Sequence, residues 1–396
     1  MRIAILNAGH MTQGGTERVV AHQARELHNR DHQVQIFVPY ARNGVFDEVI
    51  PEDVAIDSWG KRFPVPRIGA SFNRLLHFWS GVSKLGSFDI LIAHNQPAPY
   101  AAYKVKKGFN TPYLVYMHGP WRRLYPRKID VASGWAGGGK SRILGATQSY
   151  WKRIDRTSVL ASSGVLANSR YTMREVEALY GVLSTVCYPG VDVNERAGAN
   201  GMVEEAARRY DIDEHTILSV GRHVPQKKLE WIPEILRKVT DEVPPARFLI
   251  TGRPTRYTQI MMREAERRGL RHRLILAGEV AEIELMALYR LCPILCSVAV
   301  EEEFSLAPIE AMASGCVPLA WNEAGPAETI EDGVDGFLAP PYDLTQMAGM
   351  ISTLLMDHEK RENMSKKARE KAASFTWKGH ADILEEAIQQ ALVCNC

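Results

Sequence analysis

Short apolar runs alternate with longer amphipathic stretches along most of the chain. In the first half the runs lie at residues 3–7, 34–38, 90–93, 113–117 and 159–167. After the first run, apolar residues recur at helical spacing, and Thr16 is expected to cap that helix. Strands and helices alternating in this way predict an α/β fold with doubly wound parallel sheets, in which ligands bind beyond the carboxyl ends of the strands.

A second series of apolar runs lies at residues 217–220, 247–252, 274–278, 294–298 and 317–320. Because 396 residues exceed what one compact core usually holds, we expect two Rossmann-like domains. We place the first at residues 1–193 and the second at residues 202–375. A polar segment rich in Gly and Ala, at about 194–201, is predicted to link them.

The stretch at residues 300–315 carries the strongest chemical signal. Its apolar residues predict a short helix that begins near Ser305, with Pro308 in its first turn and Gly315 as a left-handed C-cap. The free N–H groups at the start of such a helix favour a phosphate or a polyhydroxy ligand.

Two carboxylates belong to this stretch, Glu302 before the helix and Glu310 within it. Carboxylates accept hydrogen bonds from pairs of sugar hydroxyls, so the two can hold different parts of one elongated ligand. We interpret the neighbouring Glu301 and Glu303 as a solvated acidic run.

The loop that follows the run at residues 217–220 contains two cations, Arg222 and Lys227, five residues apart. Both can converge on a diphosphate, the arginine through its planar fork and the lysine as a point charge. The alternative is ordinary solvated surface charge.

Residues 302–313 resemble the signature of the family 4 glycosyltransferases, in which seven residues separate two glutamates. The family begins this signature with Glu, Gly, Phe, Gly and Leu, and Glu303 and Ser305 replace its two glycines here. The resemblance implies that Glu302 holds donor-sugar hydroxyls and that Glu310 holds the nucleotide ribose. It also implies that backbone N–H groups line the sugar and phosphate site, namely those of Phe304, Ser305 and Leu306.

Other segments resemble the same family. The loop with Arg222 and Lys227 is similar to its diphosphate-binding loop, although His223 and Lys228 depart from the pattern. By the same resemblance, Glu279 and Val280 contact the base through backbone groups.

In the first half, Gly14 and Gly15 resemble the family's Gly-Gly loop, which faces donor and acceptor. His118 resembles its active-site histidine, near the donor anomeric carbon. We therefore assign His118 to the site and interpret His94 as a residue that makes a local hydrogen bond.

Family membership implies the GT-B fold, in which two domains face a central cleft. The first domain would bind the acceptor and the second the nucleotide sugar, and a closing helix at about 376–396 would pack back on the first. The implied reaction is transfer of a hexose to a hydroxyl of a saccharide or glycolipid with retention of anomeric configuration. Arg222 and Lys227 would stabilise the departing diphosphate, so we expect no metal and no cofactor other than the nucleotide-sugar co-substrate.

UDP-glucose is the first donor that we expect, and GDP-mannose the second. A UDP-sugar epimerase and a non-catalytic nucleotide-sugar binder are the alternatives. Residues 134–141 match the ATP-binding pattern G-x4-G-K-S, but no strand-like run precedes them, so a glycine-rich loop near the acceptor is preferred. Asp211 and Asp213 match D-x-D and are interpreted as surface acids.

Composition and charge limit the partners and the cellular location that we expect. A net charge of +2 gives no reason to expect nucleic acid as a partner. The sequence lacks an apolar run of bilayer length and starts with a strand, so we expect a cytoplasmic protein. The six cysteines show no zinc or disulfide spacing and are expected to be reduced thiols.

Basic residues gather around an amphipathic pattern at residues 72–79 and in two further clusters. One interpretation is a solvated surface, and the other is peripheral contact with the inner face of the cell membrane, close to a lipid-linked acceptor. The two clusters are Lys104, Lys106 and Lys107, and Arg122, Arg123, Arg127 and Lys128.

Overall fold

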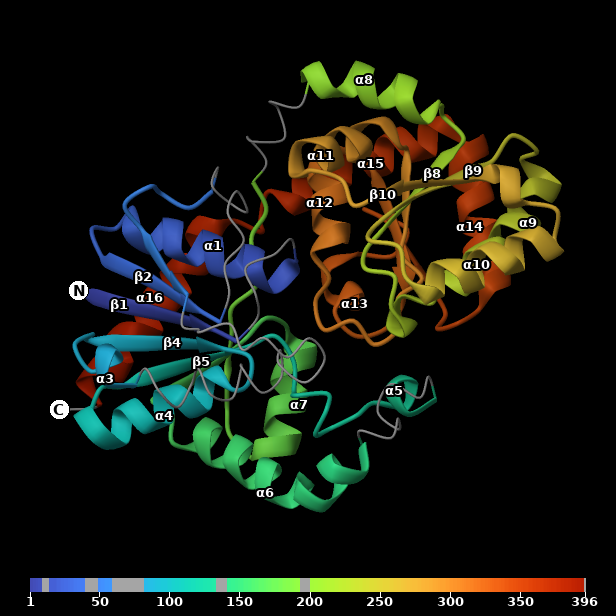
Figure 1. Ribbon diagram of the computed structural model, residues 1–396. Helices are drawn as coiled ribbons and strands as arrows, with labels where there is room; N and C mark the ends of the chain where they lie inside the picture. The colour runs from blue at the N-terminus through green and yellow to red at the C-terminus, as the bar shows by residue number, and fades with distance from the viewer. Residues whose placement is uncertain (9–13, 40–48, 59–81, 133–140, 193–199, 395–396) are drawn as a thin grey trace. The chain divides into compact units, whose positions relative to one another are not determined.

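The computed structural model describes residues 1–8, 14–39, 49–58, 82–132, 141–192 and 200–394 (Figure 1). The chain forms two compact units, Met1–Gly190 with Trp377–Cys396, and Val191–Thr376. Three expectations fall outside the described residues: the helix at 72–79, positions 134–140 of the glycine-rich motif and positions 194–199 of the linker.

The first unit contains a seven-stranded parallel sheet with the order β3-β2-β1-β4-β5-β6-β7. The order reverses between β1 and β4, and this switch point is where open parallel sheets bind ligands. The strands are β1 (Arg2–Asn7), β2 (Gln33–Val38), β3 (Ala55–Ser58), β4 (Ile90–His94), β5 (Tyr113–Met117), β6 (Gly164–Ala167) and β7 (Thr185–Val186).

Helices cover both faces of this sheet because its strands are apolar on both sides. One buried cluster joins Ile3 and Ile5 to α1 (Gly15–His28) and α16 (Trp377–Val393). The other joins Leu91 and Val115 to α4 (Ala98–Phe109), α6 (Ser141–Leu160) and α7 (Arg170–Tyr180). Two short helices are α3 (Val82–Leu85) and α5 (Lys128–Ala132).

The last helix, α16, belongs to the first unit although the second unit precedes it in sequence (Figure 1). Leu384 and Ile388 are fully buried in the first core. Arg30, which follows α1, donates to Asp382 at 2.6 Å and to Glu385 at 2.7 Å. Packing and ion pairs together hold α16 against α1.

The second unit contains a six-stranded sheet with the order β10-β9-β8-β11-β12-β13, and all its pairings are parallel. Its switch point lies between β8 and β11. The strands are β8 (Thr216–Val220), β9 (Arg247–Thr251), β10 (Leu274–Gly278), β11 (Ile294–Cys296), β12 (Val317–Trp321) and β13 (Phe337–Ala339).

Helices alternate with these strands. They are α8 (Asn200–Tyr210), α9 (Ile232–Glu242), α10 (Arg256–Arg267), α11 (Glu282–Leu291), α12 (Leu306–Ser314), α13 (Pro326–Thr329), α14 (Leu344–Met356) and α15 (His358–Ala372), with 3-10 turns η2 (Pro225–Lys227), η3 (Leu229–Trp231) and η4 (Arg271–Arg273). The predicted α/β fold with two Rossmann-like parallel-sheet domains is therefore confirmed.

Three local expectations were wrong. The apolar run at 159–167 is not one strand, because Val159 and Leu160 end α6 and β6 begins at Gly164. The strands β3, β7 and β13 were missed. Thr16 does not cap α1, since the helix starts one residue earlier and Gly14 occupies the N-cap position in extended conformation.

Cys187, Cys292, Cys296 and Cys316 are buried free thiols, and Cys394 is an exposed one. Burial raises the pKa of each buried thiol, that of Cys296 to about 12, so these groups stay protonated at neutral pH. In the described part of the chain, no helix combines the length and apolar character needed to cross a bilayer.

Candidate functional site

The loop after β8 carries the two predicted cations. The side chain of Lys227 runs back over Gly221, where an added Cβ would lie 3.1 Å from the lysine Cε. Its Nζ lies 3.0 Å from Oε1 of Glu302, and both side chains are largely buried. Since β8 and β11 are neighbours in the sheet, the loops after them bring these two predicted site residues into contact.

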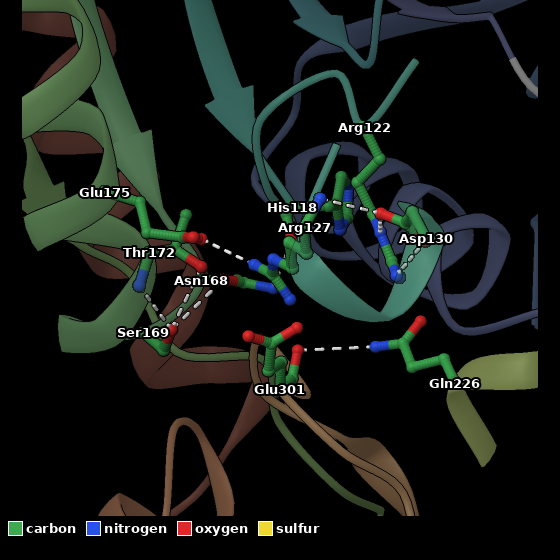
Figure 2. Close-up of polar contacts among 10 residues, drawn as sticks. All are labelled: His118, Arg122, Arg127, Asp130, Asn168, Ser169, Thr172, Glu175, Gln226 and Glu301. Atoms are coloured by element: carbon green, nitrogen blue, oxygen red, sulfur yellow. Dashed lines mark hydrogen bonds and ion pairs between the residues drawn. The ribbon is translucent and has the colours of Figure 1, made fainter. Parts of the chain in front are cut away.

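Backbone contacts tie the two loops together. Val300 N–H donates to Gln226 C=O at 3.0 Å, and the Gln226 amide donates to Glu301 C=O at 3.3 Å (Figure 2). Glu301 N–H donates to Glu323, and Glu301 and Glu303 are only partly exposed. Because one carboxylate oxygen of Glu301 is buried, the interpretation of Glu301 as a solvated acid was wrong, and that of Glu303 stays a prediction.

The segment before α12 has an unusual backbone. Ser305 has φ of 63° and Glu301 has φ of 51°, a region that favours glycine, and the Ser305 side chain does not cap α12. Gly325 N–H donates to Glu302 C=O at 2.8 Å, and an added Cβ at Gly325 would lie 2.4 Å from Phe304 Cα. Only glycine fits there without displacing the loop that carries Glu302.

Glu310 lies in α12, which begins at Leu306 and ends at a left-handed Gly315, close to the predicted bounds. Its carboxylate is buried, and Oε2 accepts from the hydroxyl of Tyr289 on α11 at 2.9 Å. Sequence reasoning missed Tyr289, because a tyrosine within an apolar helix gives no sign of its hydroxyl's partner.

His223 anchors the cation loop from inside. This fully buried ring lies 2.6 Å from Thr258 Oγ1 and 3.2 Å from Thr251 C=O, and Thr255 donates to its backbone carbonyl. Burial lowers the pKa of His223, so the ring is neutral. Arg222, one residue earlier, is exposed; its carbonyl accepts from Val224 N–H at 2.9 Å, and its guanidinium forms no hydrogen bond or ion pair with a described residue.

Glu279 and Val280 follow β10 at the same edge of the sheet, where Gly252 N–H donates to Gly278 C=O at 2.7 Å. Glu279 is exposed and Val280 is partly buried. All predicted donor residues of the second unit thus lie beyond the carboxyl ends of three strands, β8, β10 and β11, or on α12.

The D-x-D carboxylates have structural partners. Arg247 lies 2.7 Å from Asp211 and 3.0 Å from Asp213, and Asp213 also accepts from Thr216. Among the described residues, no three His, Cys, Asp or Glu side chains gather as a metal site would require. Metal independence stays a prediction.

In the first unit the predicted residues lie at the same kind of edge. Gly14 and Gly15 start α1, and an added Cβ at Gly14 would lie 2.4 Å from a carboxylate oxygen of Glu17. His118 follows β5 and His94 ends β4. The expectation that His94 makes a local hydrogen bond was wrong, because its partners His118 and Gln23 are 24 and 71 residues away in the sequence.

The histidines of this unit form a chain of contacts. His94 Nδ1 lies 2.9 Å from His118 Nε2, and His94 Nε2 lies 2.8 Å from Gln23 Oε1. Gln23 Nε2 lies 2.9 Å from His380 Nε2, and His380 Nδ1 lies 2.8 Å from Tyr188 C=O. Sequence reasoning missed Gln23 and His380, since nothing local relates them to His118.

Burial keeps these rings uncharged. It lowers the pKa of His118 to about 3 and that of His380 to about 4, and it lowers the pKa of His94 far below its usual value. Positive charge on a neighbouring histidine would lower the pKa of His94 and His118 further. All three rings are therefore neutral at pH 7.

Family models match both halves of the chain. Residues 13–195 match the model described as Glycosyltransferase Family 4, and residues 203–371 match that described as Glycosyl transferases group 1. The curated D-inositol 3-phosphate glycosyltransferases of Mycobacterium tuberculosis and Mycobacterium bovis are 25% identical over 237 residues, 58% of this chain and 48% of theirs. The chain spans about half the length of the curated relatives it matches.

Solved structures resemble the whole chain. Anabaena HepE in complex with UDP-glucose has a TM-score of 0.79 at 18% identity and covers 98% of this chain and 99% of its own. Sucrose-phosphate synthase from Thermosynechococcus elongatus has a TM-score of 0.78 at 17% identity, covering 99% of each chain. At such identities the likeness shows the fold, which is GT-B.

The buried neutral histidines predict loss of stability in acid. Unfolding frees each ring to bind a proton near pH 6.5, whereas the folded state binds it only at lower pH, so stability falls as pH drops below about 6.5. Each ring adds at most ~1.4 kcal/mol per pH unit. Denaturant unfolding at pH 7, 6 and 5 measures this slope.

The matched variants are His380→Gln, which should flatten the slope, and His272→Gln at an exposed position, which should leave it unchanged. Equal slopes in the two variants would contradict burial of a neutral His380.

Proposed function

Because this chain belongs to the family 4 glycosyltransferases, we propose that it transfers a hexose from a nucleotide diphosphate sugar to a hydroxyl of a saccharide or lipid-linked acceptor. The contact between Lys227 and Glu302 at the switch point of the second sheet carries the proposal. UDP-glucose is the first donor to test, since HepE, of the same fold, has been solved with it. GDP-mannose is the second.

In this proposal the second unit binds the donor. Lys227 and Arg222 stabilise the negative charge that grows on the departing diphosphate, without a metal. Glu302 holds Lys227 over Gly221 before the donor arrives and accepts from donor-sugar hydroxyls with its other oxygen. Preorganised charges of this kind need no rearrangement during the reaction.

The nucleotide would extend along the same edge. The Tyr289 hydroxyl orients the Glu310 carboxylate, whose other oxygen would accept from the ribose hydroxyls. The N–H groups at Phe304, Ser305 and Leu306 would face the sugar and phosphates at the start of α12. Glu279 and Val280 would contact the base.

The first unit would bind the acceptor, and at the carboxyl ends of its strands Gly14 and Gly15 would face donor and acceptor, with His118 near the donor anomeric carbon. Retention at the anomeric carbon is the stereochemical outcome that we propose.

Donor turnover tests the proposal directly. The protein is incubated with UDP-glucose, GDP-mannose or ATP, each with Mg2+ or EDTA, and released nucleotide and sugar products are followed. We expect UDP release that EDTA does not reduce. Lys227→Ala should lower kcat/KM about a hundredfold, because a charge-assisted contact with the diphosphate is lost.

Lys228→Ala is the matched control, since Lys228 lies in the same loop but contacts Glu230 and the face of Trp231. It should retain activity. Turnover of ATP alone, conversion of the sugar without transfer, or equal losses in the two variants would each exclude the assignment.

The role of Tyr289 gives a separate prediction. Tyr289→Phe should raise KM for the nucleotide sugar about fivefold with kcat nearly unchanged, because the ribose-binding carboxylate loses one orienting hydrogen bond. Tyr210→Phe removes a similar bond, to Glu284 at 2.9 Å, and should leave KM unchanged. Initial rates over a range of donor concentrations decide between these outcomes.

A membrane-bound acceptor fits one surface of the first unit. The helices α4 and α6 pack on each other, and their only acidic residue, Asp155, is buried. Among the exposed or partly exposed side chains described on these helices are four aromatic and four basic ones, namely Tyr100, Tyr103, Lys104, Lys107, Tyr150, Trp151, Lys152 and Arg153. Aromatic rings interleaved with cations suit the headgroup region of an anionic membrane.

The predicted second basic cluster fits this role less well. Arg122 forms a two-bond ion pair with Asp130, and Arg127 contacts Glu175 at 2.6 Å (Figure 2). Their charges are balanced within the unit, so we limit the proposed membrane surface to α4 and α6.

Vesicle flotation tests this surface. We expect binding to vesicles with anionic lipid, weak binding to neutral ones, and loss of about tenfold in affinity with Lys107→Glu and Arg153→Glu together. The pair Arg263→Glu and Lys366→Glu changes the net charge equally on the second unit and should bind as the wild type does. Equal weakening by both pairs would contradict a specific surface.

A further inference from the structure

The hydrogen bonds from His118 to Tyr188 join four side chains from separate elements. His118 follows β5, His94 ends β4, Gln23 lies on α1, and His380 lies on α16. Gln23 and His94 are fully buried and His380 is nearly so. No part of the donor chemistry proposed above uses Gln23, His94 or His380.

The backbone at one end sets the direction of every bond. Two groups lie near His380 Nδ1, the Tyr188 carbonyl at 2.8 Å, which only accepts, and the Cys187 thiol at 3.3 Å, which is a weak donor. The shorter contact with the stronger partner places the proton on Nδ1, so Nε2 is a bare acceptor in the neutral ring. The Gln23 amide must then donate its N–H to His380 and turn its oxygen to His94. His94 Nε2 carries the proton that this oxygen accepts.

The direction of the bond between His94 and His118 follows from the proton on His94 Nε2. With Nε2 protonated, the neutral His94 ring presents a bare Nδ1, which accepts from His118 Nε2–H at 2.9 Å. His118 Nδ1 is left without a proton. No described residue forms a hydrogen bond to that atom.

We propose that His94, Gln23 and His380 are positioning residues that hold His118 in its Nε2–H tautomer, with the Nδ1 lone pair free to accept from a hydroxyl. The inference rests on the proposed function for the nature of that hydroxyl, which would belong to the donor sugar or the acceptor. In this tautomer His118 orients a hydroxyl and does not donate to a phosphate oxygen at Nδ1.

Burial supports the assignment because it keeps the three rings neutral, as their lowered pKa values indicate. A protonated His94 or His380 would have two donors and no acceptor and would break the sequence of bonds at that ring, whereas a protonated His118 could no longer accept from a hydroxyl at Nδ1. The sequence of hydrogen bonds also requires α16, because this helix supplies His380. A residue of the last helix thus sets the tautomer of His118, which lies between β5 and α5.

Nitrogen NMR on the full-length protein labelled at histidine reads the tautomer directly, without substrate. We expect His118, assigned from the signals that His118→Gln removes, to have Nε2 protonated and Nδ1 bare at pH 7. A protonated Nδ1 would overturn the proposal whether or not the protein transfers sugar.

Variants of His380, at the end of the hydrogen-bond sequence opposite His118, test whether His380 controls the His118 tautomer. His380→Leu removes the acceptor, so the Gln23 amide is free to turn over and the direction can reverse. We expect a substantial share of His118 to shift to the Nδ1–H tautomer and kcat/KM with a turned-over donor to fall about tenfold, roughly the loss of one hydrogen bond. His380→Gln keeps an acceptor oxygen and should retain the tautomer and most activity.

Arg30→Ala separates this effect from weaker attachment of α16. It removes the ion pairs to Asp382 and Glu385 while leaving all four bonds in place. It should lower stability without changing the tautomer or kcat/KM. A wild-type tautomer in His380→Leu, or a shifted one in Arg30→Ala, would overturn the proposal.

If no sugar donor is turned over but the tautomers behave as expected, the proposed function fails and the positioning role stands.

Discussion

The contact between Lys227 Nζ and Glu302 Oε1 is the interaction on which the candidate site depends. It joins the ends of two neighbouring strands, and three kinds of support hold it. His223 anchors the Lys227 loop through its hydrogen bond with Thr258. Gly325 has no side chain and so lets its backbone pack against the Glu302 loop, and Gln226 joins the two loops by a hydrogen bond. Because these supports join the loop after β8 to β9 and α10, and to the loops after β11 and β12, the contact requires that those strands be assembled.

The first unit uses a comparable arrangement with neutral groups. His118 stands at the edge of its sheet as Lys227 stands at the edge of the other, but hydrogen bonds between uncharged rings orient it. Burial lowers the pKa of these rings. The lowered pKa values reduce the stability of the unit in acid, and they keep each ring neutral, with one donor and one acceptor nitrogen. The helix that supplies His380, α16, is the segment by which the chain returns to the first unit, and it also packs in the core of that unit.

Predictions from the sequence succeeded where the signal was local. Apolar runs marked β1, β4, β5 and β8 to within one residue, and Pro308 with Gly315 marked α12. They failed where two local signals competed. Val159 and Leu160 are as apolar as a strand, yet they close a helix that packs on α4. Gly14 and not Thr16 occupies the N-cap position, where an added Cβ would lie 2.4 Å from a carboxylate oxygen of Glu17.

By itself the sequence determined the fold class and the residue types of the candidate site, since strand and helix periodicity and the spacing of Arg222, Lys227, Glu302 and Glu310 are properties of short segments. Only the tertiary structure decided that Lys227 touches Glu302, that Tyr289 holds Glu310, and that Gln23 and His380 lead to His118. These contacts join residues from separate strands and helices. Pairings of that kind follow from strand order and helix packing, which no short segment contains.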